Sequence, residues 1–437
     1  MKKMMALFIV LMPITLYYDI GNLEIRLNTA INMLLAICAV FMILKEKRYL
    51  SKPVGFYLLF VLWHLFSSVF HALYAEYEVS LSIVTYLYSI SIAIIIFSSF
   101  YDLIDYEFFM KAYKVTGSIV LMFLFVQIIS FHLFGHVIRG MLPFLPITES
   151  YGGEGAWRYG VYLVSEGSQY NAFSSLFSEG SHFSLYMVPL LCIVMPLKEN
   201  NSFRGYTLPA LITVGILLVN SGNGLICCLI IWVSHMLLKS NLSISKKMFG
   251  LVFIGLICLS VYTILSRNSN YDAMLGRLFV IEDSSKYATA KADYRIYRGF
   301  DLYSQLPIIN KIFGVGYKAL TSSANYFGIT SIYDKSNIQA FEYLNTIAQI
   351  LIYSGAVGFL LFFAFVKNLF KTLQANGKII LITFLALCFS SSIYYDAIWE
   401  FTLVLIVYYS SARRGSASKL EQVPTQLKAD ASHRNIR

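Results

Sequence analysis

Charge is scarce in this 437-residue chain. Only 13% of its residues are Asp, Glu, Lys or Arg, whereas 57% are hydrophobic and the mean hydropathy is +0.65. A soluble domain carries roughly 25% charged residues, so this composition excludes a water-soluble globular protein. We therefore expect a polytopic integral membrane protein.

Cysteine is missing from every long polar segment. All six cysteines lie within apolar runs: Cys38, Cys192, Cys227, Cys228, Cys258 and Cys388. Because the polar loops hold no thiol, no disulfide forms there. Clustered Asp, His or Cys at metal-ligand spacing is also lacking. The sequence thus predicts a protein without a metal or another cofactor.

Apolar runs of membrane-spanning length recur along the whole chain. A helix needs about 20 apolar residues to cross the ~30 Å hydrocarbon layer. The runs are solid rather than alternating, which favours helices over a β-barrel. We predict an all-α protein with about twelve spans, in a range of eleven to thirteen. The predicted spans cover residues 4–18, 27–44, 54–73, 80–100, 115–135, 182–197, 207–219, 224–238, 248–265, 346–366, 379–393 and 398–409.

Basic residues mark one side of these spans. Short loops on that side carry lysines such as Lys47, Lys198 and Lys371, whereas the short loops on the other side contain only Arg26. By the positive-inside rule, both termini are cytoplasmic. Two long polar loops then face the opposite side, which in a bacterium is the periplasm. The net charge of +10 is mostly this topological signal, so it gives no reason to invoke nucleic acid.

These spans and loops divide the chain into six segments. Residues 1–135 hold the first five spans, and 136–180 form the first large loop. Residues 181–266 hold the next four spans, and 267–343 form the second large loop. Residues 344–411 hold the last three spans. The cytoplasmic tail, 412–437, has too little apolar content to pack and is expected to be disordered.

The spans themselves offer little chemistry. Transporters keep ionisable groups at membrane depth, where each is costly and survives only for function. His64 and His235 are the main such groups, and each is expected to be a neutral imidazole bonded to a neighbouring helix. We expect no Asp, Glu, Lys or Arg deep inside the spans. This weakens a transporter function and directs attention to the loops.

The first large loop ends directly before a span, in Ser178-Glu-Gly-Ser181. The helix below would hold the Glu179 carboxylate rigidly at the membrane surface, where it could serve as a general base. The alternative is a flexible polar loop in which Gly and Ser simply break helices.

Residues 293–306 of the second large loop predict a surface helix. Arg295 and Arg298 lie three residues apart and therefore share a face, with Tyr294 and Tyr297 interleaved. A guanidinium fork matches phosphate geometry, and aromatic neighbours offer stacking surfaces for sugar rings. The alternative is a solvated face of ion pairs with nearby aspartates.

Several short motifs follow one another in a fixed order. They are Ser178-Glu-Gly-Ser181, Asn220-Ser-Gly-Asn-Gly224, Gly276-Arg-Leu278, Asp293-Tyr-Arg295, Phe313-Gly-Val-Gly316, Leu344-Asn345 and Gly355-Ala-Val-Gly358. This order resembles the O-antigen polymerase (Wzy-type) family, within the wider group that includes O-antigen ligases. The resemblance covers about residues 158–359. Gly180 stands where Pro is usual and Gly222 where Arg is common. Leu344 occupies the position where ligase-like members have His, which favours a polymerase.

The resemblance implies an activity and its partners. It implies a metal-independent glycosyltransferase with a glycosyltransferase C-like fold in the bacterial inner membrane, its active site facing the periplasm. The enzyme would move a growing glycan from undecaprenyl diphosphate to the non-reducing end of a new lipid-linked repeat unit. Expected partners are the undecaprenyl-diphosphate-linked oligosaccharide, the lipid bilayer and a chain-length regulator protein. Ligation of O-antigen and polysaccharide flipping or transport stay open as alternatives.

The candidate site residues follow from the loops and from this resemblance. We expect Glu179, and after it Glu342, to be the catalytic base. Arg295 and Arg298 are expected to bind diphosphate, with Arg277 and Arg158 as weaker candidates. The remaining candidates for substrate binding are Asn345, Tyr294 and Tyr297.

Overall fold

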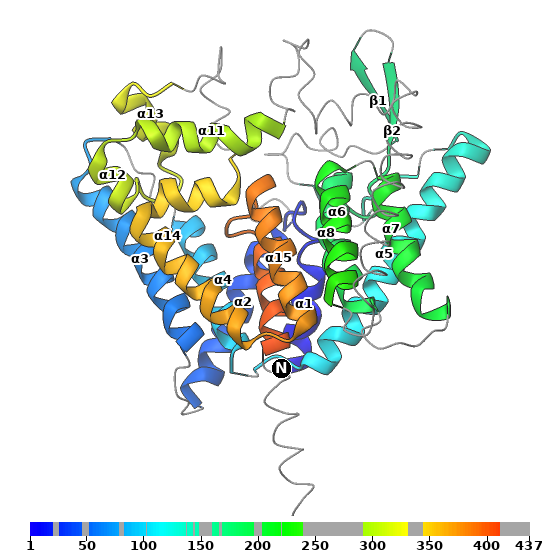
Figure 1. The fold of residues 1–437 in the computed structure, drawn as a ribbon. Coiled ribbons are helices and arrows are strands. Elements are labelled where there is room, and N and C mark those ends of the chain that lie inside the picture. The colour runs from blue at the N-terminus through cyan, green and yellow to red at the C-terminus, as the bar shows by residue number, and fades with distance from the viewer. Residues whose placement is uncertain are drawn as a thin grey trace, which may run out of the picture.

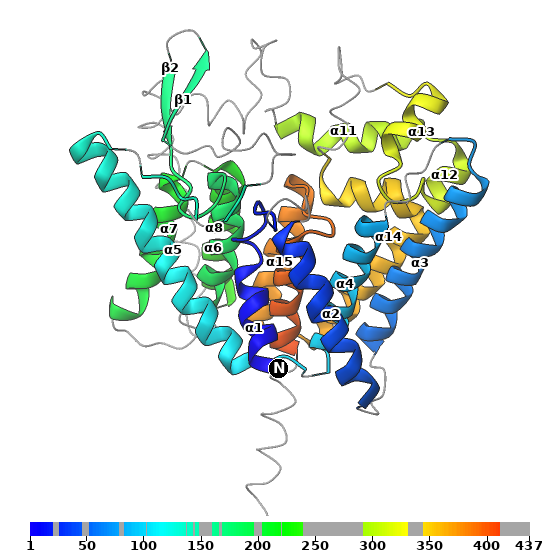
Figure 2. The same ribbon diagram turned by 180° about the vertical axis from the view of Figure 1, so that it is seen from behind.

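Long apolar helices stand side by side in the computed structural model (Figures 1 and 2). The structure describes residues 1–20, 26–45, 52–77, 83–101, 103–136, 138–142, 145–147, 160–165, 168–195, 203–219, 221–238, 292–330 and 344–410. Four helices are long and apolar enough to cross a membrane: α2 (Leu27–Lys45), α3 (Lys52–Tyr74), α5 (Tyr106–Phe134) and α14 (Thr346–Thr372). The helical class is therefore confirmed, and these apolar helices support a membrane protein.

Shorter apolar helices complete the bundle. They are α4 (Ile83–Ser99), α6 (Gly180–Val194), α7 (Thr207–Leu218), α8 (Gly222–Leu238), α15 (Ala375–Ser390) and a helix over Ala397–Ser410, with the 3₁₀ turn η3 (Phe203–Tyr206) before α7. Most of these elements begin and end within a few residues of the predicted spans. The predicted span 248–265 and the tail 412–437 lie outside the described residues.

The first predicted span is wrong in length. Helix α1 (Lys2–Leu11) has 10 residues, which rise only about 15 Å, and turns carry the chain from Met12 to Tyr17. Pro13 explains the end, because proline lacks the N–H that would continue the helical ladder.

The fifth predicted span begins too late. Helix α5 starts at Tyr106, because Asp105 caps it by accepting a hydrogen bond from the Phe108 backbone N–H at 3.0 Å. The first turns of α5 therefore extend beyond the apolar run that predicted it.

Apolar side chains cover the outside of the bundle as well as its core. Leu59, Leu62 and Phe66 on α3 and Ile119 and Met122 on α5 are all more than half exposed. A soluble monomer rarely exposes apolar surface on this scale, whereas lipid tails cover it at no cost. The apolar outer surface of the bundle is thus suited to contact with lipid tails.

Helices α3 and α14 form the closest pair in the core. Tyr57 packs against Phe365 with ring centroids 5.2 Å apart, and Trp63 Nε1 donates to the carbonyl oxygen of Ser354 at 2.8 Å. His64 Nδ1 lies 3.1 Å from Ser354 Oγ, which confirms the prediction of an imidazole bonded to a neighbouring helix.

Glu400 corrects the expectation that the spans hold no deeply placed acid. It lies in the helix Ala397–Ser410 and is fully buried, and its Oε2 atom accepts a hydrogen bond from Asn32 Nδ2 on α2 at 2.7 Å. The averaged hydropathy of the apolar run conceals a single carboxyl group near its start. The argument against ionisable groups inside the bundle is therefore wrong.

The described parts of both large loops lie at the same end of the bundle. The strands β1 (Gly160–Ser165) and β2 (Ser168–Ala172) pair as an antiparallel hairpin. The second loop contributes α11 (Ala292–Gln305), α12 (Ile308–Phe313) and α13 (Leu320–Phe327). All of these elements lie opposite the N-terminus (Figure 1). We call this the loop-bearing end.

Candidate functional site

Glu179 stands where the first large loop turns into α6. It occupies the capping position before the first helical residue, and Ser181 Oγ donates a hydrogen bond to its Oε2 atom at 3.0 Å. The ring of His182 lies 3.2 Å from Ser178 Oγ and 3.0 Å from the Tyr17 hydroxyl. A carboxylate, three hydroxyls and an imidazole therefore gather at the mouth of this span.

The turn before α8 packs against this helix start. Gly180 leaves room for it, since a Cβ atom there would lie 2.6 Å from the carbonyl oxygen of Val219. Asn223 at the start of α8 donates from Nδ2 to Ser391 Oγ at 2.6 Å. The carbonyl oxygen of Ser391, just after α15, accepts from the Thr346 hydroxyl at 2.8 Å. Polar and steric contacts thus link the starts of α6, α8 and α14.

Asn345 joins α14 to the second loop. Its Oδ1 atom accepts from the backbone N–H of Ala348 at 2.8 Å and so caps α14, while Nδ2 donates to the carbonyl oxygen of Ile296 on α11 at 2.9 Å. The side chain is buried. Sequence reasoning proposes Asn345 as a substrate contact, and in the structure its amide group holds α11 across the start of α14.

Helix α11 confirms the predicted helix and separates two of its candidate side chains. Arg298 is fully buried, whereas Tyr297 is 54% exposed. The alternative of a solvated face is therefore wrong for Arg298, and its predicted role in diphosphate binding stays a prediction. Its guanidinium offers five N–H donors in a fixed fork, in a place where exclusion of water strengthens electrostatic interactions. Arg295 and Tyr294 belong to α11, but their side chains lie outside the described residues.

Two glycine motifs far apart in the sequence meet in one contact. Helix α14 is interrupted at Gly355, where φ is +66°, and Gly314 after α12 has φ of +90°. The Val315 backbone N–H donates to the carbonyl oxygen of Ile352 at 2.8 Å. A Cβ atom at Gly355 would collide with the carbonyl oxygen of Ile312. We call Gly314 and Gly355 the glycine latch, because they let the loop backbone lie directly on α14.

Asp396 is a candidate that sequence reasoning missed. Its Oδ1 atom accepts from the backbone N–H of Trp399 at 2.8 Å, at the start of the helix Ala397–Ser410. Burial raises the pKa of the Asp396 carboxyl to about 7, although backbone N–H groups oppose this shift. Burial also raises the pKa of the nearby Tyr317 phenol to about 12. A carboxyl group that titrates near neutral pH suits proton transfer.

A sequence signal for Asp396 did exist. It stands alone as an acid in a short loop, directly before an apolar run. Acids in such places cap helices and become partly dehydrated. Because the two large loops hold the conspicuous polar motifs, sequence reasoning does not reach this short one.

Other candidates lie outside the described residues. These are the second candidate base and two of the arginines: Glu342, Arg277 and Arg158. Their predicted roles stay predictions. Within the part of the chain that the structure describes, no group of three or more His, Cys, Asp and Glu side chains could hold a metal ion. The expectation of a metal-independent reaction likewise stays a prediction.

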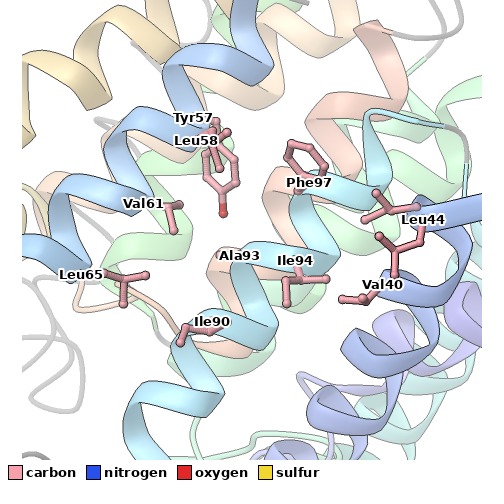
Figure 3. Close-up of a pocket in the computed structure, with 11 residues that line it drawn as sticks. Val40, Leu44, Tyr57, Leu58, Val61, Leu65, Ile90, Ala93, Ile94 and Phe97 are labelled. Carbon is pink, nitrogen blue, oxygen red and sulfur yellow. The ribbon is translucent and has the colours of Figure 1, made fainter. Parts of the chain in front are cut away.

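An apolar groove of about 240 Å³ opens between α2, α3 and α4 (Figure 3). Val40 on α2, Val61 on α3 and Ile94 on α4 line it, together with the ring of Tyr57. Such a surface offers a sugar ring few hydrogen-bonding partners, and it suits a hydrocarbon chain better.

The start of α6 and helix α11 bring the Glu179 carboxylate, several hydroxyls and the buried Arg298 guanidinium to the loop-bearing end. A carboxylate can accept a proton from a sugar hydroxyl, and a guanidinium can stabilise a phosphate leaving group.

In the comparisons with known proteins, no family model matches the chain and no curated protein matches it.

Proposed function

We propose that the protein is a glycosyltransferase that polymerises lipid-linked polysaccharide repeats at one membrane surface. In this proposal it transfers a growing glycan from undecaprenyl diphosphate to the non-reducing end of a new lipid-linked repeat unit, as in O-antigen polymerases of the Wzy type. The bilayer anchors both polyprenyl tails, so membrane spans and large loops at one surface suit the reaction.

The meeting of the sequence motifs at the loop-bearing end carries this proposal. Ser178-Glu-Gly-Ser181 lies against the turn before α8, and Asn223 at the start of α8 reaches the start of α14 through Ser391. The motif after α12 lies on Gly355 of α14. Motifs selected only for their order along the chain thus fall into two contacting groups, one at the starts of α6, α8 and α14 and one at Gly355.

The proposed chemistry is an acceptor attack on a lipid-linked donor. Glu179 takes the proton from the acceptor hydroxyl, whose oxygen then bonds to the anomeric carbon of the donor sugar. The bond from that carbon to the diphosphate oxygen breaks, and the diphosphate leaves with the electron pair. Arg298 and Arg295 of α11 stabilise its negative charge, with Arg277 and Arg158 in weaker roles. Glu342 is the second candidate base.

The proposed topology has about twelve spans and places both termini in the cytoplasm. The loop-bearing end then faces the periplasm of a bacterial inner membrane. Reporter tags inserted near Lys47, Lys198 and Lys371 are expected to report cytoplasm, because the basic loops stay inside. Tags near Gly153 and Ser285 are expected to report periplasm. A cytoplasmic signal at Ser285 would contradict both the orientation and the mechanism.

Lipopolysaccharide gels of a deletion strain test the reaction itself. Loss of a polymerase leaves lipid A core carrying one repeat unit, because ligation still proceeds. Loss of a ligase or a flippase leaves core without any repeat. Core with a single repeat is therefore the expected result, restored to long chains by the wild-type gene. Bare core would contradict polymerisation and favour one of the alternatives.

One observation supports the alternative function of a polysaccharide transporter. Glu400 is fully buried inside the bundle, and buried acids mark ion pathways in many transporters. The same gel separates the two functions, because a flippase defect removes the first repeat as well as the later ones.

A further inference from the structure

Glu400 is an acid that the proposed glycosyl transfer does not use. Its side chain is fully buried, and its Oε2 atom accepts from Asn32 Nδ2 at 2.7 Å. Among the described residues, no Lys, Arg or His pairs with it. An isolated ionised carboxylate is strongly unfavourable away from water. Its charge therefore needs compensation from something other than a fixed side chain.

Several buried oxygen atoms without a hydrogen-bond donor lie on the helices around this carboxyl group. Glu400 Oε1 is buried without a hydrogen-bond partner, and so is Asn32 Oδ1, because the Asn32 amide points its nitrogen at the carboxyl group. One turn earlier on α2, Asn28 donates to the Tyr88 hydroxyl at 3.1 Å and also leaves Oδ1 unpartnered. The Tyr57 hydroxyl on α3 has no partner either. Buried acceptors that lack donors call for a positive charge.

The groups that face Glu400 from the surrounding helices are acidic or neutral. Asp396 directly precedes the helix that holds Glu400, four residues before it. Tyr57 is on α3 and Tyr88 on α4. All three interact with Glu400 electrostatically. On α2 the facing groups are amides. Arg26 interacts electrostatically with Tyr88, and it is not among the groups that act on Glu400. No described side chain therefore supplies the missing charge.

A route to this position starts at the loop-bearing end. Asp396 is partly exposed there, and its backbone carbonyl accepts from the Glu400 N–H at 3.1 Å. The two carboxyl groups are thus one helical turn apart, Asp396 partly exposed and Glu400 enclosed. A small cation could pass from the first carboxyl group to the second.

We propose that Glu400 and Asn32 form a binding site for one monovalent cation, a proton or a sodium ion, that enters from the loop-bearing end past Asp396. The shared chemistry is compensation of a buried carboxylate. A sodium ion would use the Glu400 and Asn32 oxygens as ligands, since hard cations prefer oxygen. A proton would convert Glu400 to its neutral acid. The site does not depend on glycosyl transfer, so its test needs no substrate.

Thermal unfolding of the purified full-length protein in detergent distinguishes the two cations. The scans use the chlorides of sodium, potassium and choline at equal ionic strength, each over a series of pH values. If sodium binds, the wild-type midpoint in sodium exceeds that in choline by at least about 2 °C, and both Glu400→Gln and Asn32→Leu abolish the difference.

If a proton binds, the unfolding midpoint is the same in all three salts and depends on pH alone. The wild-type midpoint then falls as pH rises, because ionisation creates an uncompensated buried charge. Glu400→Gln loses the part of this dependence that comes from Glu400 and keeps the part that comes from Asp396, whereas Asn32→Leu keeps both parts. Glu107→Gln is the matched control, because Glu107 is an exposed acid in the first turn of α5, and it should behave as wild type.

Equal responses of wild type and Glu400→Gln to sodium and to pH would overturn the proposal. Should Glu400→Gln fail to fold, the sodium response of Asn32→Leu tests sodium binding. Infrared spectroscopy tests proton binding, because a protonated Glu400 shows a carboxylic acid C=O band near neutral pH. Asn32→Leu removes the hydrogen bond to Oε2 and should shift that band. Absence of both the sodium response and the band would also overturn the proposal.

Discussion

Two polar regions of the bundle use their hydrogen-bonding groups in opposite ways. At the loop-bearing end, Asn345 uses both sides of its amide group to hold α14 and α11, and Asn223 reaches Ser391. Around Glu400, by contrast, Asn32 uses only its nitrogen, and its oxygen has no partner. The first pattern fixes helices in place. The second leaves hydrogen-bonding capacity unused, which the proposed cation would take up.

Glu179→Gln should have the largest effect on activity. It tests whether the loop-bearing end has a catalytic role beside the structural one. The amide keeps the shape of the side chain and loses its basicity, so turnover on lipid-linked repeat units should fall by roughly 10² to 10⁴. Unfolding stability should change by well under about 1 kcal/mol, since Glu179 is only partly buried. Substrate binding is measured separately, and Glu107→Gln serves as the control. Near wild-type turnover would remove Glu179 as the base and make Glu342→Gln and Asp396→Asn the next variants.

Arg298→Ala should have the next largest effect. Removing a fully buried guanidinium leaves its surroundings without a partner, and such changes cost about 3 to 5 kcal/mol of unfolding stability. Arg298→Lys keeps the charge but loses the fork, so it should rescue poorly. Chemical denaturation in detergent gives the stabilities, with the exposed neighbour Tyr297→Ala as the reference for α11. A stable Arg298→Ala protein with full polymerase activity would contradict both roles of this residue.

Gly355→Ala tests whether the glycine latch fixes the second loop. A methyl group there meets the carbonyl oxygen of Ile312 at a positive φ, so the loss of unfolding stability should be about 3 kcal/mol. Gly328→Ala is the matched control, because Gly328 also has a positive φ, of +62°, yet a methyl group added there would meet no atom within 4 Å. It should lose only about 1 kcal/mol. Equal losses in both variants would mean that the latch contributes nothing beyond backbone conformation.

Asp396→Asn should have the smallest effect on unfolding stability. It tests how far the acid next to Glu400 is perturbed by burial. The folded protein raises the pKa of Asp396 from its usual 3.8 to about 7, so the folded state binds a proton more tightly than the unfolded state. Its stabilisation is full below about pH 4 and is lost as the pH rises through about 7. The variant should lack this decline, which partial exposure limits to about 1 to 2 kcal/mol. Parallel pH profiles of the two proteins would show that Asp396 is not perturbed.

Much of the fold follows from the sequence because apolar runs and helix periodicity are local signals. The run 27–44 predicts α2, and residues 293–306 predict α11 within one residue at each end. The end of α1 depends on one proline, Pro13, inside an apolar run. A window that averages hydropathy does not register a single residue of this kind.

The candidate site is less predictable, because side-chain roles depend on contacts between distant segments. Asn345 looks like a substrate contact in sequence, and only the position of Ile296 reveals that its nitrogen holds α11. Arg298 lies in sequence on a predicted surface helix, and only the folded structure reveals that its side chain is fully buried. Glu400 gains its significance from Asn32, a residue far away along the chain. Local patterns give the residue types, and the tertiary contacts assign the roles.

The glycine latch also constrains the order of events during biosynthesis. Gly314 precedes Gly355 in the chain, so it emerges from the ribosome before the helix on which it rests. The bond from Val315 to Ile352 therefore cannot form until α14 has been made and inserted. The second loop already has contacts with α3, which is made earlier, since Ser67 Oγ donates to the carbonyl oxygen of Phe313 at 2.7 Å. Its attachment to α14 is the late step of assembly, timed by the arrival of that helix.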